Sequence, residues 1–137
     1  MNKSLKITYY AVTILFSAFM LVDGIAGLMR IPEGQEIMEH LGYPVYILSI
    51  LGAAKVLGAI GILQNRFSLM KEWAYAGFTF HFLGAAASRA FAGDSLILII
   101  SPLLFMSIMF ISYFLWKPVQ RVRREKVGET ADELAYI

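Results

Sequence analysis

Four long apolar segments, separated by short polar stretches, dominate the pattern of this chain. They cover residues 7–29, 44–63, 73–89 and 96–116. Each is close to the ~20 residues that an α-helix needs to cross a ~30 Å hydrocarbon core. The fourth segment carries no charge. The third has a lower hydropathy, because it contains several alanines and glycines. The pattern predicts an all-α protein, a transmembrane four-helix bundle.

The polar stretches set the expected boundaries. The first apolar segment has a basic start, but it is longer than the roughly 7–15 residues of a signal-peptide core, so we interpret it as an uncleaved span. Residues 35–41 fit a short interfacial helix. We expect a four-span membrane domain over residues 1–117. A charged tail over 118–137 should follow it, with an acidic, frayed end from residue 128.

Composition supports a membrane protein. The chain is 58% hydrophobic and 16% charged, with a mean hydropathy of +0.65. Soluble domains are nearer 45–50% apolar and about a quarter charged. There is no cysteine, which excludes disulfides and thiolate metal sites. His40 and His81 are far apart in the sequence, so no metal site is expected, and no nucleic-acid partner is expected.

The basic residues predict the orientation. An even number of spans places both termini on one face, together with the loop over residues 64–71. Nine basic residues lie on that face and only Arg30 and Arg89 on the other, so both termini should be cytoplasmic. The nine are Lys3, Lys6, Arg66, Lys71, Lys117, Arg121, Arg123, Arg124 and Lys126. The basic cluster over residues 120–126 fits anionic-lipid binding, but a positive-inside stop signal is the favoured interpretation. The aromatic residues on this side predict an interfacial belt of Tyr9, Tyr10, Trp73, Tyr75, Tyr113 and Trp116.

Lys55 lies inside the second apolar segment, where a charge is costly unless it faces other helices and has a partner. Asp23 and Lys55 lie at depths that a long lysine side chain can bridge. Arg89 competes for the same aspartate, and the sequence leaves this choice open. Gly52 and Gly58 flank Lys55, which predicts that it points toward a neighbouring helix.

The third segment shows a similar pattern of small residues. Gly77, Gly84 and Ser88 share one helical face with His81. Small residues let transmembrane helices approach closely, so we expect this face to contact another helix.

Three motifs carry a family resemblance. They are Gly42-Tyr43-Pro44, Leu51-Gly52-Ala53-Ala54-Lys55 and Lys71-Glu72-Trp73-Ala74-Tyr75-Ala76-Gly77-Phe78. Over roughly residues 7–117 the chain resembles the DoxX-like family of small four-helix membrane proteins, which are mostly bacterial. The resemblance implies the bacterial cytoplasmic (inner) membrane. It also suggests quinone as a ligand, because the family is named after a subunit associated with a quinone-linked oxidoreductase. Arg89 stands where relatives often have histidine, which argues against a proton relay there.

The polar residues within the apolar segments form the candidate site. We expect Asp23, Lys55 and His81, with Arg89, Tyr43 and Glu72, to bind a small amphipathic molecule such as a quinone or lipid. The alternative is structural: a charge pair fixes helix register, and His81 bonds to a backbone carbonyl. Glu72 is more typical of a solvated charge at a helix start.

Several function classes stay open. No nucleophile is paired with a base and no glycine-rich phosphate loop is present, so catalysis by this chain alone is not expected. A ligand-binding protein, as an accessory subunit of a redox complex, is the leading hypothesis. The alternatives are a non-catalytic scaffold or interaction subunit and an ion pathway. Expected partners are the lipid bilayer and a membrane partner subunit or a second copy of the chain.

Overall fold

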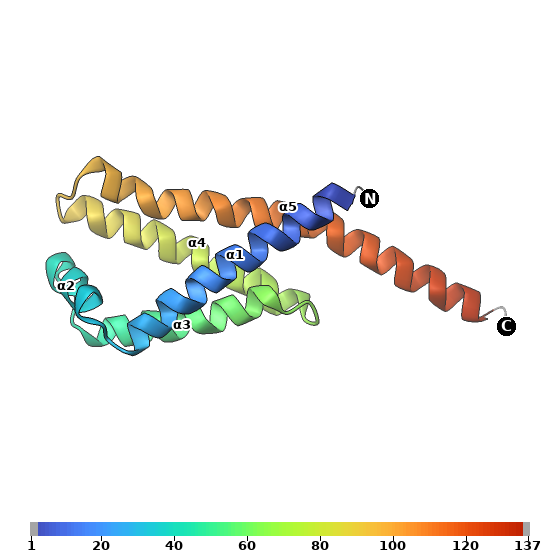
Figure 1. Ribbon diagram of the computed structural model, residues 1–137, viewed down its shortest axis with the longest axis horizontal. Coiled ribbons are helices and arrows are strands. Elements are labelled where there is room, and N and C mark those ends of the chain that lie inside the picture. The colour runs from blue at the N-terminus through green and yellow to red at the C-terminus, as the bar shows by residue number, and fades with distance from the viewer. Residues whose placement is uncertain (1–2, 136–137) are drawn as a thin grey trace.

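The computed structural model describes residues 3–135, except for the side chains of residues 122–124 and 132–133. The described part is all-α, as expected, and has five helices (Figure 1). They are α1 (Lys3–Leu28), α2 (Pro32–Leu41), α3 (Tyr46–Leu63), α4 (Ser68–Phe91) and α5 (Leu96–Ala135).

The four long helices contact one another in the cyclic order α1, α3, α4, α5 and back to α1. The start of α1, the α3–α4 loop and the last part of α5 lie at one end, which we call the N-terminal end (Figure 1). The short helix α2 and the α4–α5 loop lie at the other, the α2 end. Helix α1 crosses obliquely, from α5 at the N-terminal end to α3 at the α2 end.

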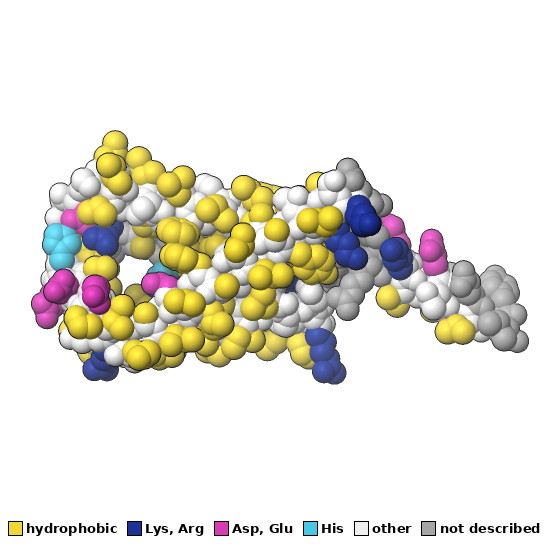
Figure 2. Space-filling model, viewed as in Figure 1, with side chains coloured by type: hydrophobic (Ala, Val, Ile, Leu, Met, Phe, Trp, Pro, Cys, Tyr) yellow, Lys and Arg dark blue, Asp and Glu magenta, His cyan; other side chains and the backbone are white. Residues whose placement is uncertain are grey.

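Three of the described helices, α1, α3 and α5, are long and apolar enough to cross a membrane. Helix α4 has 24 residues and is long enough, but its alanines, glycines and polar side chains make it less apolar than these three helices. Its outward side chains are nevertheless apolar: Trp73 is 73% exposed and Phe80 is 75% exposed. Hydrophobic side chains cover much of the visible face of the long helices, and charged ones gather mainly toward the two ends (Figure 2).

Large side chains hold α4 against its neighbours. Its buried residues are Lys71, Tyr75, Phe78, Phe82 and Ala86, which recur at helical spacing. The rings of Phe16 and Phe78 meet edge to face with centroids 5.5 Å apart. The prediction that Gly77 and Gly84 mark a helix contact is wrong, because a Cβ at either position would meet nothing within 4 Å. The aromatic stripe, and not the glycine stripe, is the packing face of α4.

The prediction of an interfacial aromatic belt needs correction, because half of its residues pack inside the bundle. Tyr10 and Trp73 are exposed, but Tyr9, Tyr75 and Trp116 are buried, with exposed fractions of 1%, 3% and 4%. A chain of hydroxyl groups ties three helices together in this region. The Ser112 hydroxyl lies 2.6 Å from that of Thr13 and 2.7 Å from that of Tyr75. Such bonds between buried hydroxyls stabilise helix contacts where no water competes.

Helices α1 and α3 approach closely at glycine. A Cβ on Gly52 would lie 2.6 Å from the Gly24 carbonyl oxygen, and one on Gly24 would lie 2.8 Å from that of Gly52. Only glycine fits at both positions, because any side chain would push the two backbones apart. The expectation that Gly52 lies at a helix contact is confirmed, whereas sequence reasoning missed its partner Gly24.

The short helix α2 has clear start and stop signals. Pro32 occupies its first turn, where no backbone donor is needed. Gly42 ends it with φ of +82°, and the Tyr43 N–H donates to the Met38 carbonyl at 2.9 Å. A short helix expected over residues 35–41 is therefore present, and it begins three residues earlier.

Helix α5 continues through two prolines. Pro102 leaves the Leu98 carbonyl without its usual backbone donor, and the Ser101 hydroxyl donates to that carbonyl at 3.1 Å. Beyond Pro118 the helix runs on to Ala135 and projects past the other helices (Figure 1). The prediction of a frayed end from residue 128 is wrong for residues 128–135, because this segment continues α5. Residues 136–137 of that segment lie outside the described residues.

The glycine contact predicts a contrast between two Gly→Ala variants. Gly52→Ala should lower the stability of the protein in detergent by about 1–3 kcal/mol, because the added methyl group overpacks the α1–α3 contact. Gly77→Ala should be neutral or stabilising by up to ~1 kcal/mol, since alanine is the better helix former and its site is open. Thermal unfolding followed by circular dichroism tests this; equal losses in both variants would contradict it.

Candidate functional site

The charge within the second apolar segment has a partner. The Lys55 ammonium donates to the Asp23 carboxylate at 2.5 Å, joining α3 to α1. The Lys55 side chain is 18% exposed and that of Asp23 is 47% exposed. The pair lies next to the Gly24–Gly52 contact, where a Cβ on Gly24 would be 3.0 Å from the Lys55 Cβ. The close approach of the backbones therefore brings the two charges together.

A groove between α3 and α4 passes beside this pair. It has a volume of about 780 Å³ and mostly apolar walls. Lys55 and His81 line it from opposite helices, and Gly58, Gly77 and Trp73 are among the other lining residues. His81 is half-buried and lies within electrostatic range of both Lys55 and Asp23. An apolar groove with a few convergent polar groups is typical of a small-molecule site.

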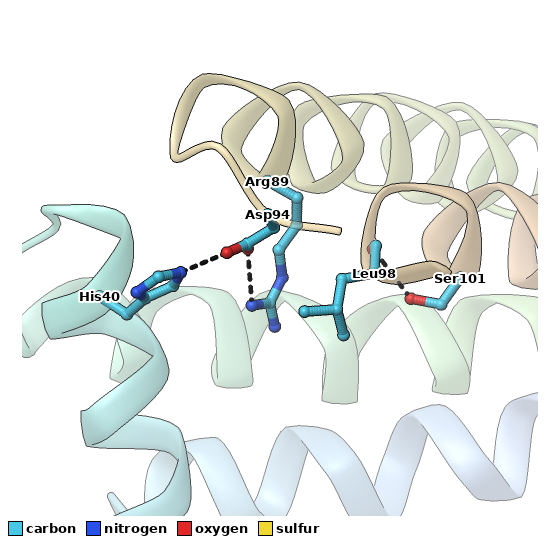
Figure 3. A network of polar contacts seen from close by, with 5 residues as sticks. All are labelled: His40, Arg89, Asp94, Leu98 and Ser101. Atoms are coloured by element: carbon cyan, nitrogen blue, oxygen red, sulfur yellow. Dashed lines mark hydrogen bonds and ion pairs between the residues drawn. The ribbon is translucent and has the colours of Figure 1, made fainter. Parts of the chain in front are cut away.

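A polar network closes the α2 end. The His40 ring and the Arg89 guanidinium both approach the Asp94 carboxylate, at 2.5 Å and 3.1 Å (Figure 3). The network connects α2, the end of α4 and the α4–α5 loop. The hydrogen bond from His40, and then that from Arg89, holds the pKa of Asp94 below its usual value. Sequence reasoning did not include Asp94 or His40 among the candidate site residues.

This network answers the question that the sequence left open. Arg89 pairs with Asp94 across the loop, and Asp23 pairs with Lys55. The Tyr43 hydroxyl lies at the same end, 2.7 Å from the Ser88 hydroxyl. Arg89 and Tyr43 therefore belong to a separate cluster beyond the Asp23–Lys55 pair. Figure 2 shows a hollow near this end, with acidic and histidine side chains beside it.

Glu72 lies apart from the other candidates. It forms an ion pair with Lys117 of α5 and accepts a hydrogen bond from the Tyr113 hydroxyl at 3.1 Å. Both partners are at the N-terminal end, whereas Lys55 and His81 line the groove farther along. The structure thus separates Glu72 from the grouping in which the sequence placed it.

Lys71 is the polar residue that sequence reasoning missed. Its side chain is 1% exposed, and its ammonium donates to the Tyr9 hydroxyl and to Asn65 Oδ1. It also lies 5.4 Å from the centroid of the Trp116 ring, a cation–π contact. One signal in the sequence was available: Lys71 falls four residues before Tyr75, in register with the aromatic stripe of α4.

The comparison with known families rests on the same segments. The sequence profile of the DoxX-like family matches residues 11–112, from the first turns of α1 to the middle of α5. The chain belongs to the DoxX-like family. No curated protein and no solved structure matches it.

Family and structure together identify this DoxX-like chain as a membrane protein whose apolar helices contact the lipid bilayer. Among the described residues that line the α3–α4 groove, Lys55 and His81 are the ionisable ones. Among the described side chains, no group of three histidines or carboxylates is placed to hold a metal ion.

The Asp94 network predicts a pH dependence of stability. Because the folded state lowers the pKa of Asp94 from its unfolded value of about 3.9, the carboxylate contributes its full stabilisation above that value. The contribution is lost as the pH falls through the lower folded-state pKa. The melting temperature of this DoxX-like protein should therefore exceed that of Asp94→Asn at neutral pH, and the difference should vanish in strong acid.

Glu36, an exposed carboxylate on α2, provides the matched control. The Glu36→Gln variant should melt within about 1 °C of the parent protein at every pH, as expected of an exposed position without special contacts. A melting-temperature difference for Asp94→Asn that does not change between neutral and acidic pH would contradict the predicted linkage.

Proposed function

We propose that this protein binds a small amphipathic molecule, a quinone or a lipid, in the groove between α3 and α4. The supporting observation is the position of Lys55 and His81 on the walls of an apolar groove of about 780 Å³. A quinone carries carbonyl oxygens that accept hydrogen bonds, and an ammonium and an imidazole N–H are suitable donors. The apolar walls suit its ring and isoprenoid tail.

The proposal includes a place in the membrane. All four long helices, α4 included, cross the bacterial cytoplasmic membrane, and both termini are cytoplasmic. The cyclic contacts of the four helices and the apolar outward side chains of α4 support this arrangement. The excess of basic residues at the N-terminal end supports the orientation. In this setting the groove opens toward lipid, from which a hydrophobic ligand enters.

A role as accessory subunit of a redox complex follows from the same groove. A bound quinone would be exposed along α3 and α4, where a membrane partner subunit can reach it. This chain then supplies binding and orientation, and the partner supplies the electron transfer.

Two glycines provide a matched test of the groove. Gly77 lines it and Gly84 does not, and a Cβ at either position meets nothing within 4 Å. Gly77→Leu should fill the groove and weaken binding of decylubiquinone at least about tenfold, a change equivalent to ~1.4 kcal/mol. Gly84→Leu should bind as the parent protein does. Quenching of tryptophan fluorescence measures the affinity, and Trp73→Phe, which removes the groove tryptophan, should abolish the signal.

Equal affinity of the Gly77→Leu and Gly84→Leu variants would rule out the groove as the quinone site. If decylubiquinone shows no saturable quenching at all, a native mass spectrum in gentle detergent decides whether a lipid occupies the groove. Loss of a bound lipid mass in Gly77→Leu alone would support the lipid form of the proposal.

A second candidate function is a scaffold whose buried charges are structural. The observation that favours it is the Lys55–Asp23 pair at 2.5 Å, which already satisfies both charges. On this alternative, Lys55→Met destabilises the protein because Asp23 is left unpaired, and Asp23→Asn restores much of the loss. Ligand affinity per folded molecule would then be the same in parent and variants.

The four-span arrangement is tested by cysteine labelling, since the chain has no cysteine of its own. Phe91→Cys lies at the end of α4, where the side chain is 93% exposed, and Lys3→Cys lies at the start of α1. A membrane-impermeant maleimide should label Phe91→Cys in intact spheroplasts and Lys3→Cys only after lysis. Labelling of both before lysis would contradict the orientation proposed for α4 and the termini.

A further inference from the structure

A second cavity lies at the N-terminal end, away from the α3–α4 groove. It has a volume of about 320 Å³ and shares no lining residue with the groove. Two cations, Arg66 and Lys71, line it together with neutral side chains that carry polar groups, namely Asn65, Ser68, Gln120, Tyr10 and Trp116. None of the described residues that line it is acidic. The lining is therefore a set of hydrogen-bond donors with a net positive charge.

The Lys71 ammonium is held in place beside this cavity. The Tyr9 hydroxyl and Asn65 Oδ1 accept its hydrogen bonds, the second at 2.9 Å. The ring centroids of Tyr9 and Trp116 lie 5.2 Å and 5.4 Å from its nitrogen. These contacts hold the ammonium at the wall of the cavity, in the same lining as the Arg66 guanidinium.

The start of α4 adds to this potential. The helix begins at Ser68, and its N-cap residue Phe67 provides no side-chain hydrogen bond. The unpaired N–H groups of a first turn carry a partial positive charge and bind anions. Gln120 Nε2 donates to the Ser68 hydroxyl at 2.6 Å, which ties α5 to the same edge of the cavity.

We propose that this cavity binds the phosphate group of an anionic ligand, carried by a phospholipid head group or by a free phosphate compound. Lys71 is the fixed cation at the base of the site, and the exposed Arg66 is the cation at its mouth. A guanidinium and an ammonium together recognise phosphate through charge-assisted hydrogen bonds. In the proposed membrane orientation, the cavity lies at the cytoplasmic surface, where anionic head groups are abundant.

The fluorescence of Trp116 provides the test, since this residue lines the cavity and Trp73 is the other tryptophan of the chain. In the Trp73→Phe background, Trp116 is the source of the tryptophan fluorescence. Dihexanoyl-phosphatidylglycerol, inorganic phosphate and dihexanoyl-phosphatidylcholine are titrated in turn into the purified full-length protein in detergent. A saturable change with phosphatidylglycerol alone assigns a lipid head group. A saturable change with inorganic phosphate as well assigns the phosphate group itself.

Arg66→Gln tests the site without disturbing the core, and Arg121→Gln is its matched control. Both arginines are exposed at the N-terminal end, but only Arg66 lines the cavity. Arg66→Gln should weaken binding about fivefold, whereas Arg121→Gln should change it by less than about twofold. Lys71→Met, if it folds, should abolish the signal.

Three results would overturn the proposal. The first is the absence of a saturable signal with both anions, and the second is equal binding of phosphatidylcholine. The third is an equal effect of the two arginine variants, which would indicate general surface attraction. None of these depends on the α3–α4 groove, so failure here and failure of the quinone proposal are distinguishable.

Discussion

The close contact between α1 and α3 at Gly24 and Gly52 is the constraint on which the arrangement of the helices depends. Two backbones meet there with no space for a side chain. Because they meet, Asp23 and Lys55 pair across the contact, and neither charge is left alone among apolar helices. The same oblique crossing takes α1 from α5 at the N-terminal end to α3 at the α2 end.

Helix α4 packs against its neighbours through aromatic side chains and not through glycines. Its aromatic side chains and Lys71 pack inward, and this leaves the face with Gly77 and His81 uncovered. Gly77, which would serve as a helix contact in a tighter packing, instead lines the groove. The exposure of His81 to the groove is thus a consequence of how the aromatic residues pack.

The charged residues at the two ends of the molecule have different kinds of partner. At the α2 end, the His40 ring and the Arg89 guanidinium meet the Asp94 carboxylate and tie together segments far apart in the sequence. At the N-terminal end, Lys71 contacts the Tyr9 hydroxyl, the Asn65 side-chain amide and the Trp116 ring. The first cluster contains a carboxylate, whereas no acidic side chain is among the described residues that line the N-terminal cavity. The two ends of the same helix bundle therefore present different polar groups.

The sequence by itself determined the class and the elements. Apolar runs of about 20 residues can only be buried in lipid or in a protein core, so the existence and order of the four long helices follow from hydropathy. The start of α4 at Ser68 and the continuation of α5 to Ala135 do not, because polar residues form these parts. The family also followed from local motifs. The need of Lys55 for an interhelical partner followed from the cost of burying a charge.

Tertiary structure decided the pairings. Asp23 meets Lys55 rather than Arg89, and Arg89 pairs with Asp94 of the α4–α5 loop, because helix crossing angles set which side chains meet. The burial of Lys71 and Trp116 and the openness of Gly77 depend on helix rotation. Rotation is fixed by the sum of many side-chain contacts between helices, and no local pattern in the sequence contains that sum.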